Sequence, residues 1–206
     1  YRCSITAPEG EQREATLRYY ESCIALAAGL GCDRLVLDAS GACWDRKDEL
    51  LWRSAADTLY HLCPAAQAAG VRLLLAPVMG AETPLIAESP ILNTAAELDA
   101  MLHQLNHPSL GVCLDTNIMS ACGDTVYDWF GRFRDKIGLV RLCDGNYHGW
   151  RAWGEGVLPM QRYLHALDAM GYRGDISLRL PGERYLAQPA YPDERALAAL
   201  CGEVGA

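Results

Sequence analysis

The sequence predicts an α/β protein in which parallel strands alternate with helices. Short runs rich in Leu, Val and Ile alternate with longer segments of helical periodicity, and glycine follows several of the helical segments. The strand-like runs are continuously apolar, which is typical of strands that are covered on both faces. This alternation is expected to give right-handed βαβ crossovers and a parallel sheet.

Local signals set the bounds of five strands and six helices. Glycine is expected to end the first two helices, at 29–31 and at Gly70, and Thr94 with Glu97 has the spacing of a capping box. The predicted strands are 34–38, 71–76, 110–114, 137–143 and 175–180. The predicted helices are 11–29, 45–69, 94–105, 124–135, 159–171 and 192–201.

Two architectures fit this order: an open doubly wound sheet and part of a (βα)8 barrel. No glycine-rich phosphate loop follows a strand, which weakens the dinucleotide-binding form of the first. Polar residues gather where strands end, and in a barrel these positions converge on one mouth. They are Asp38, Asp115, Arg141 with Asp144, and Arg179.

The barrel interpretation implies an incomplete domain. A barrel has eight strands and about 250 residues, so we expect residues 1–206 to form a single domain with its first βα units missing. The edge of strand 34–38 would then be open, and an open edge is a pairing liability. Missing sequence, a second copy or an intact partner subunit would cover it.

Composition excludes some partners and favours a cytoplasmic protein. The net charge of −8 and the pI near 5.1 argue against nucleic acid, which needs a basic face. No apolar run approaches the ~20 residues of a membrane span. The nine cysteines are scattered without CxxC or zinc spacing, so we expect reduced thiols in the cytoplasm.

Five stretches carry a family resemblance that covers about 11–200. The chain resembles the xylose isomerase-like barrel superfamily of sugar isomerases and epimerases, and within it the D-tagatose 3-epimerase and fructoselysine 3-epimerase group. The matching stretches are 73–78, 113–116, 140–144, 154–156 and 171–180, in family order and spacing.

The resemblance implies a metal site, but most of its ligand residues are replaced in this chain. Such epimerases hold one divalent ion, such as Mn, Co, Mg or Zn, with Glu, Asp, His and Glu, and the two glutamates move the proton. The matching positions carry Ala76, Asp115, Arg141 and Arg179. Arginine stays protonated and offers no lone pair to a metal. We therefore expect no cofactor and no epimerisation by the family mechanism.

Arg141 and Arg179 allow two interpretations. In the first, Asp115 pairs with one or both arginines and fills an unused site, because an unpaired buried charge would be costly. In the second, the arginines bind a carboxylate or phosphate of a sugar derivative at the barrel mouth. Asp115 could also act as a lone general base, although two neighbouring cations would keep it ionised and make it a poor base.

Other candidate residues lie in the loops that follow. Asp144 either orients the next loop or binds ligand, and Glu155 matches a substrate-side loop of the family. His148 lies in a loop with Tyr147, Trp150 and Trp153, which could cover a sugar face or close the barrel. A metal site of Cys113, Cys143, Asp115 and His148 is conceivable, but the arginines oppose it.

Three functions remain open. The leading one is a degenerate family member that has lost metal chemistry. Its present role would be to bind an anionic sugar derivative or to support a partner subunit, or it would have none beyond that of a gene fragment. The alternative is an active ketose or sugar-phosphate 3-epimerase or isomerase with rebuilt or metal-independent chemistry. A third is an ordinary epimerase whose ligands lie elsewhere, at Glu82, Glu88 or Glu183.

Overall fold

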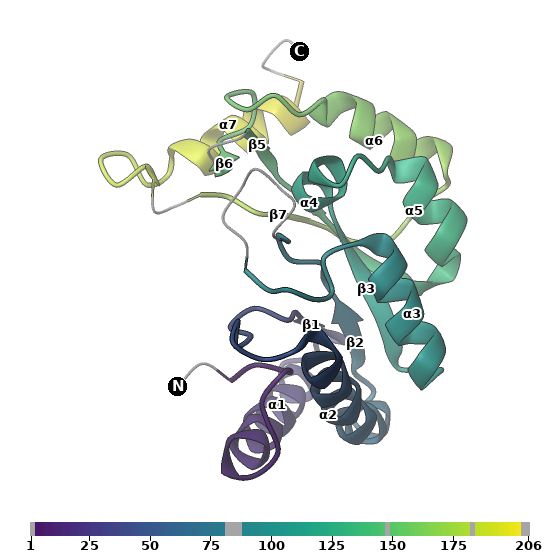
Figure 1. The fold of residues 1–206 in the computed structure, drawn as a ribbon. Coiled ribbons are helices and arrows are strands. Elements are labelled where there is room, and N and C mark those ends of the chain that lie inside the picture. Colours follow the sequence, from purple (N-terminus) through teal and green to yellow (C-terminus); the bar gives the residue numbers. More distant parts are fainter. Residues whose placement is uncertain (1–2, 81–87, 147–148, 182–183, 203–206) are drawn as a thin grey trace. The chain divides into compact units, whose positions relative to one another are not determined.

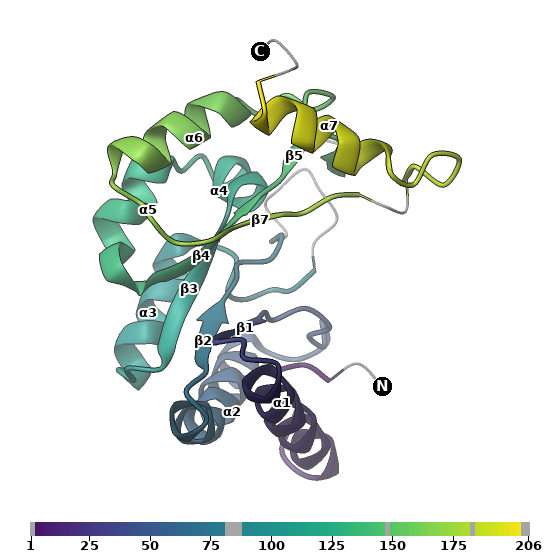
Figure 2. The same ribbon diagram turned by 180° about the vertical axis from the view of Figure 1, so that it is seen from behind.

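A computed structural model describes residues 3–80, 88–146, 149–181 and 184–202. The chain divides into two compact units, of which the first comprises Tyr1–Cys113 with Arg132–Gly138 and the second comprises Leu114–Gly131 with Leu139–Ala206. Figures 1 and 2 show the helices and strands of both units from opposite sides. Within the described residues, no helix is both long and apolar enough to cross a membrane.

The first unit consists of βα repeats. Strands β1 and β2 pair in parallel, and β2 pairs in parallel with the start of β3. Helices α1 and α2 lie side by side in both views of the ribbon (Figures 1 and 2). The elements are α1 (Glu11–Gly29), β1 (Arg34–Leu37), α2 (Asp48–Ala68), β2 (Arg72–Leu75), α3 (Ala95–Leu105), β3 (Leu110–Asp115) and the 3-10 helix η1 (Arg134–Lys136).

The second unit adds a parallel strand pair and a short hairpin. β4 pairs in parallel with β7, and β5 pairs antiparallel with β6. Helix α7 lies beside the hairpin in Figures 1 and 2. The elements are α4 (Thr116–Ala121), α5 (Val126–Phe133), β4 (Ile137–Leu142), β5 (Asp144–Asn146), β6 (Gly149–Arg151), α6 (Met160–Ala169), β7 (Ile176–Leu178) and α7 (Tyr191–Leu200).

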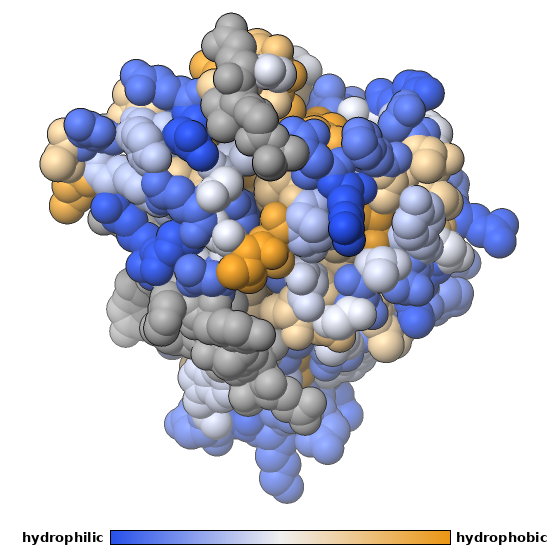
Figure 3. All heavy atoms as spheres, turned by 90° about the horizontal axis from the view of Figure 1, so that it is seen from above, coloured by the Kyte–Doolittle hydropathy of each residue, from blue (hydrophilic) through white to orange (hydrophobic). Residues whose placement is uncertain are grey.

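The hydrogen-bonded order of the parallel sheet is β1-β2-β3-β4-β7. Because strands and helices alternate along the chain, the predicted α/β class with parallel strands is confirmed. Every residue of β3 and all of β2 except the half-buried Arg72 are buried, as expected for strands with both faces covered. Figure 3 shows that hydrophilic residues occupy much of the face that it presents, with hydrophobic residues in smaller groups.

Local sequence signals explain most element ends. Thr94 and Glu97 form the predicted capping box at the start of α3. Gly70 follows α2 with φ +69°, a conformation that glycine adopts without steric cost. The structure adds α4 directly after β3 and the hairpin β5–β6 after β4. It also shortens two predicted elements, because α2 begins at Asp48 and not at residue 45, and β7 covers only Ile176–Leu178 of the predicted strand 175–180. Neither α4 nor the hairpin is predicted from the sequence.

Candidate functional site

Asp115 is the centre of the candidate site in the second unit. It ends β3 and is at the same time the N-cap residue of α4, where its Oδ1 accepts backbone N–H bonds from Asn117 at 3.1 Å and Ile118 at 3.3 Å. Aspartate is favoured at this position because its oxygen satisfies amides that lack a partner within the helix. The residue is fully buried. One carboxylate oxygen is thus engaged by the backbone.

The other oxygen faces two arginines. Arg141 on β4 places Nη1 3.9 Å from Asp115 Oδ2, and Arg179, directly after β7, places Nη1 3.5 Å from the same atom. Their side chains are 22% and 31% exposed, so both arginine side chains are partly accessible to solvent. Two positive charges and one negative charge leave this cluster with one net positive charge.

Trp150 supports Arg179 from a second side. The guanidinium carbon of Arg179 lies 3.6 Å from the centroid of the Trp150 ring, in the geometry of a cation–π contact. Trp150 belongs to β6, so the hairpin and the end of the β4–β7 pair meet at this cation. The contact holds the planar guanidinium in one orientation.

Cys143 adds a neutral donor beside the carboxylate. Its Sγ lies 3.5 Å from Asp115 Oδ2 and 3.6 Å from Oδ1. Burial raises the pKa of the thiol well above its ordinary value, and the charge of Asp115 raises it further, while Arg179 and Arg141 act in the opposite direction. Cys143 is therefore protonated and inert at neutral pH.

The donor set does not suit a hard divalent cation. Such an ion needs several oxygen ligands, but Asp115 already accepts two backbone N–H bonds and faces two guanidinium groups. In the described part of the chain, no group of three or more His, Cys, Asp or Glu side chains could hold a metal. Ala76, which the family resemblance predicts to replace another ligand, follows β2 in the first unit and is buried there.

Asp144 organises the loop after β4. Its Oδ1 accepts backbone N–H bonds from Gly145 and Leu158, and its Oδ2 accepts those of Gly154 and Gly156. These four bonds span 2.7 to 3.3 Å, and the residue is 4% exposed. Its carboxylate therefore fixes the loop around it and has little capacity left for a ligand.

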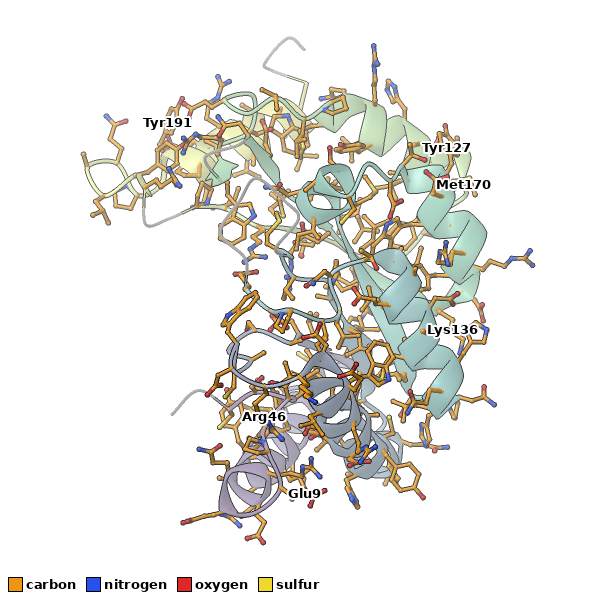
Figure 4. All side chains as sticks on the ribbon, viewed as in Figure 1. Glu9, Arg46, Tyr127, Lys136, Met170 and Tyr191 are labelled. Atoms are coloured by element: carbon orange, nitrogen blue, oxygen red, sulfur yellow. The ribbon has the colours of Figure 1, made fainter. Side chains whose placement is uncertain are left out.

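Glu155 connects this loop to the segment before α7. Its two oxygens accept hydrogen bonds from the hydroxyls of Tyr185 at 2.5 Å and Tyr191 at 2.7 Å. These two bonds, that of Tyr185 first, lower the pKa of Glu155 below its ordinary value. Figure 4 labels Tyr191 at the start of α7. Glu155 is exposed and acts here as a link between two segments.

The structure brings some predicted site residues together and leaves others apart. Asp115, Arg141 and Arg179 are in contact, whereas Asp144 and Glu155 have separate partners. Asp38, in the first unit, accepts hydrogen bonds from the backbone and hydroxyl of Ser40.

Of four other candidate residues, the structure describes only Glu88. His148, Glu82 and Glu183 lie outside the described residues. Glu88 accepts a long 3.5 Å bond from the backbone N–H of Met79 in the first unit.

Sequence reasoning missed the parts of the site that depend on loops. It left the roles of Trp150 open, and it did not identify Asn117, Tyr185 or Tyr191. The one sequence signal for the loop around Asp144 was the run Gly154-Glu155-Gly156. Close packing requires glycine at position 156, because a Cβ there would overlap Asp144 Oδ1.

Comparisons with known proteins assign the family. The xylose isomerase-like TIM barrel family matches residues 1–200, and the chain belongs to this family. The alternating βα units are therefore those of part of a TIM barrel, as the sequence predicts.

Three relatives illustrate the similarity. Fructoselysine 3-epimerase of Shigella flexneri is 22% identical over 199 residues, which cover 96% of this chain and 70% of the epimerase. 3-Dehydroshikimate dehydratase of Pseudomonas putida is 31% identical over 111 residues, which cover 48% of this chain and only 17% of the dehydratase. The apo structure of 3-keto-D-glucoside 4-epimerase from E. coli has a TM-score of 0.73 at 19% identity, and the match covers 93% of this chain and 75% of that one.

Proposed function

We propose that this chain is a sugar isomerase/epimerase-family protein that binds an anionic sugar derivative at Arg141 and Arg179 and lacks the family's metal-dependent proton transfer. The observation that carries the proposal is the convergence of both guanidinium groups on one oxygen of Asp115. The cluster keeps one net positive charge, and its two arginine side chains are partly exposed, so an incoming anion meets a positive field.

The long distances within the cluster support a binding role over a closed structural ion pair. Contacts of 3.5 and 3.9 Å exceed the 2.7–2.9 Å of a strong charge-assisted hydrogen bond. Each guanidinium carries five N–H donors, and among the described residues Asp115 is the only acidic side chain within ion-pair distance of either. A ligand carboxylate or phosphate would use donors that Asp115 leaves free.

The proposed loss of catalysis follows from the replaced residues. By the family resemblance, Ala76, Arg141 and Arg179 occupy three of four ligand positions, including both proton-transfer glutamates. The methyl group of Ala76 and the guanidinium groups of Arg141 and Arg179 cannot accept a proton from a sugar carbon at neutral pH. The names of the related epimerases support the sugar class of the ligand.

Thermal unfolding with added ligands tests the binding site. Sugar acids and sugar phosphates should raise the Tm of the chain in a concentration-dependent way, whereas the parent neutral sugars should not. Arg141→Gln and Arg179→Gln should abolish the rise, and Arg173→Gln, which removes an exposed arginine paired with Asp168, should preserve it. A flat response to every anion contradicts the binding proposal.

Metal analysis tests the loss of family chemistry. Elemental analysis of the purified chain should find no stoichiometric Mn, Co, Zn or Mg. The combined variant Ala76→Glu, Arg141→His and Arg179→Glu should regain divalent metal binding if these residues occupy the ligand positions. Stoichiometric metal in the unaltered chain, or a folded triple variant that binds none, contradicts the residue assignment.

A further inference from the structure

We propose that Asn117 and Trp150 extend this anion site and select a sugar acid, which carries one carboxylate, over a sugar phosphate. The inference rests on the proposed function and narrows its ligand class. It starts from two buried N–H groups that have no hydrogen-bond partner among the described residues and lie next to the arginine cluster. Four observations, all within the second unit, lead to it.

The side-chain amide of Asn117 is the first of these donors. Asn117 lies in the first turn of α4, two residues after Asp115, and is 5% exposed. Its Nδ2 is buried and has no hydrogen-bond partner among the residues that the structure describes. An unsatisfied buried donor costs about 1–3 kcal/mol, so an acceptor brought by a ligand would remove that cost.

The indole N–H of Trp150 is the second donor. Nε1 is buried and likewise lacks a partner within the described part of the chain. The face of the same ring is covered by the guanidinium of Arg179. A sugar therefore cannot stack on that face, whereas the indole N–H still has a hydrogen to donate to a ligand oxygen.

Gly145 connects the two donors. It pairs with Trp150 in the β5–β6 hairpin, and a Cβ at Gly145 would overlap Nδ2 of Asn117. The amide of Asn117 thus lies against the hairpin strand opposite Trp150, while Trp150 contacts Arg179 and Arg179 contacts Asp115. These contacts connect Asn117, Trp150, Arg179 and Asp115 in one cluster of N–H donors around a single carboxylate.

The charge of this surface discriminates between two kinds of anion. Asp115, Arg141 and Arg179 leave one net positive charge, which one carboxylate balances. A phosphate monoester carries about −1.5 to −2 at pH 7, and the excess negative charge would face Asp115. Asn117 and Trp150 add uncharged donors, which suit the hydroxyl oxygens of a sugar.

Calorimetric titration at fixed ionic strength and pH 7.5 tests this selection with gluconate, galacturonate, glucose 6-phosphate and glucose. We expect the sugar acids to bind about tenfold or more tightly than glucose 6-phosphate, and glucose not to bind. Trp150→Phe keeps a ring under Arg179 but removes the N–H, and should weaken sugar-acid binding about fivefold or more. Asn117→Asp places a like charge at the ligand and should weaken it about tenfold or more.

Asn106→Asp is the matched control, because it adds the same charge at the exposed end of α3 and should leave binding unchanged. If glucose 6-phosphate binds as tightly as the sugar acids or more tightly, the proposed selection is wrong, although the anion site itself is supported. Unchanged sugar-acid affinity in folded Trp150→Phe and Asn117→Asp also overturns it. Binding of no anion at all contradicts the proposed function, and the selection falls with it.

Discussion

The guanidinium of Arg179 lies over the ring of Trp150, 3.6 Å from its centroid, and joins the β5–β6 hairpin to the ion cluster of the second unit. The same group lies 3.5 Å from Asp115, which also caps α4. Asp115 therefore contributes to helix capping, charge balance and, through Arg179, hairpin position. Loss of its carboxylate should affect all three.

Asp115→Ala should destabilise the chain by about 3 kcal/mol or more. The substitution leaves two partly buried guanidinium groups without a counter-charge, a change typically worth about 3–5 kcal/mol, and it removes a cap worth about 1 kcal/mol. Asp115→Asn should cost less, because the amide oxygen can still cap α4. Urea unfolding followed by circular dichroism measures both changes.

Asp168→Ala is the control for the loss of an ion pair as such. Asp168 pairs with Arg173 at 3.0 Å, but both side chains are more than 70% exposed. Exposed pairs contribute about 0–1 kcal/mol, so this variant should unfold nearly as the unaltered chain does. Equal effects of Asp115→Ala and Asp168→Ala would mean that the central cluster has no special role in stability.

The repeating part of the fold is predictable from sequence because its signals are local. The bounds of α1 match the prediction from Glu11 to Gly29, and the capping box of Thr94 and Glu97 forms as expected. Continuous apolar runs, together with the glycines that end the helices, are sufficient to predict strands whose two faces are covered. These features depend on few contacts that are distant in sequence.

The elements around the site are not predictable in this way. Helix α4 has six residues, too few for a periodic pattern, and it begins because Asp115 caps it. The hairpin β5–β6 has no alternation of apolar residues, and four backbone bonds to Asp144 hold the adjoining loop. The cluster of Asp115, Arg141 and Arg179 was predictable as strand-end residues, whereas the contact of Arg179 with Trp150 depends on the hairpin.

Gly156→Ala should destabilise the loop that Asp144 holds. A Cβ at this position would overlap Asp144 Oδ1 and crowd the backbone of Gly145, so the loop would have to move and break bonds to the carboxylate. We expect a loss of about 2 kcal/mol and faster hydrogen exchange at the amides of Gly154 and Leu158. Hydrogen exchange read by mass spectrometry or NMR checks the effect.

Gly131→Ala makes the same chemical change where space is free. Gly131 lies within α5 and a Cβ there meets nothing within 4 Å, so alanine should stabilise the helix by about 0.5–1 kcal/mol. We therefore expect Gly156→Ala to lower the free energy of unfolding and Gly131→Ala to raise it. A destabilisation of similar size at both positions would refute the packing argument for Gly156.

The bonds from Tyr185 and Tyr191 to Glu155 should make stability depend on pH. They lower the pKa of Glu155 in the folded chain. Their stabilisation is therefore fully present above the unfolded pKa of about 4.3 and is lost as the pH falls through the lower folded value. The Tm difference between the unaltered chain and the double variant Tyr185→Phe, Tyr191→Phe should be larger at pH 6 than at pH 3.

Tyr127→Phe is the control for this pH dependence. Tyr127 lies on α5 and is 56% exposed (Figure 4). Its removal should change the Tm little and by the same amount at both pH values. If the double variant shows an equal Tm difference at pH 6 and pH 3, Glu155 is not the titrating group that links the loop to α7.

Cys143 should resist thiol reagents in the folded chain although it lies beside two arginines. Burial raises the pKa of its thiol well above the ordinary value, and only the thiolate reacts rapidly. Cys32, Cys43 and Cys201 are exposed and should be modified first. Mass spectrometry after brief treatment with iodoacetamide at pH 8 should find label on these three, and on Cys143 only after denaturation. Native labelling of Cys143 as fast as that of Cys201 would show that the arginines, and not burial, control this thiol.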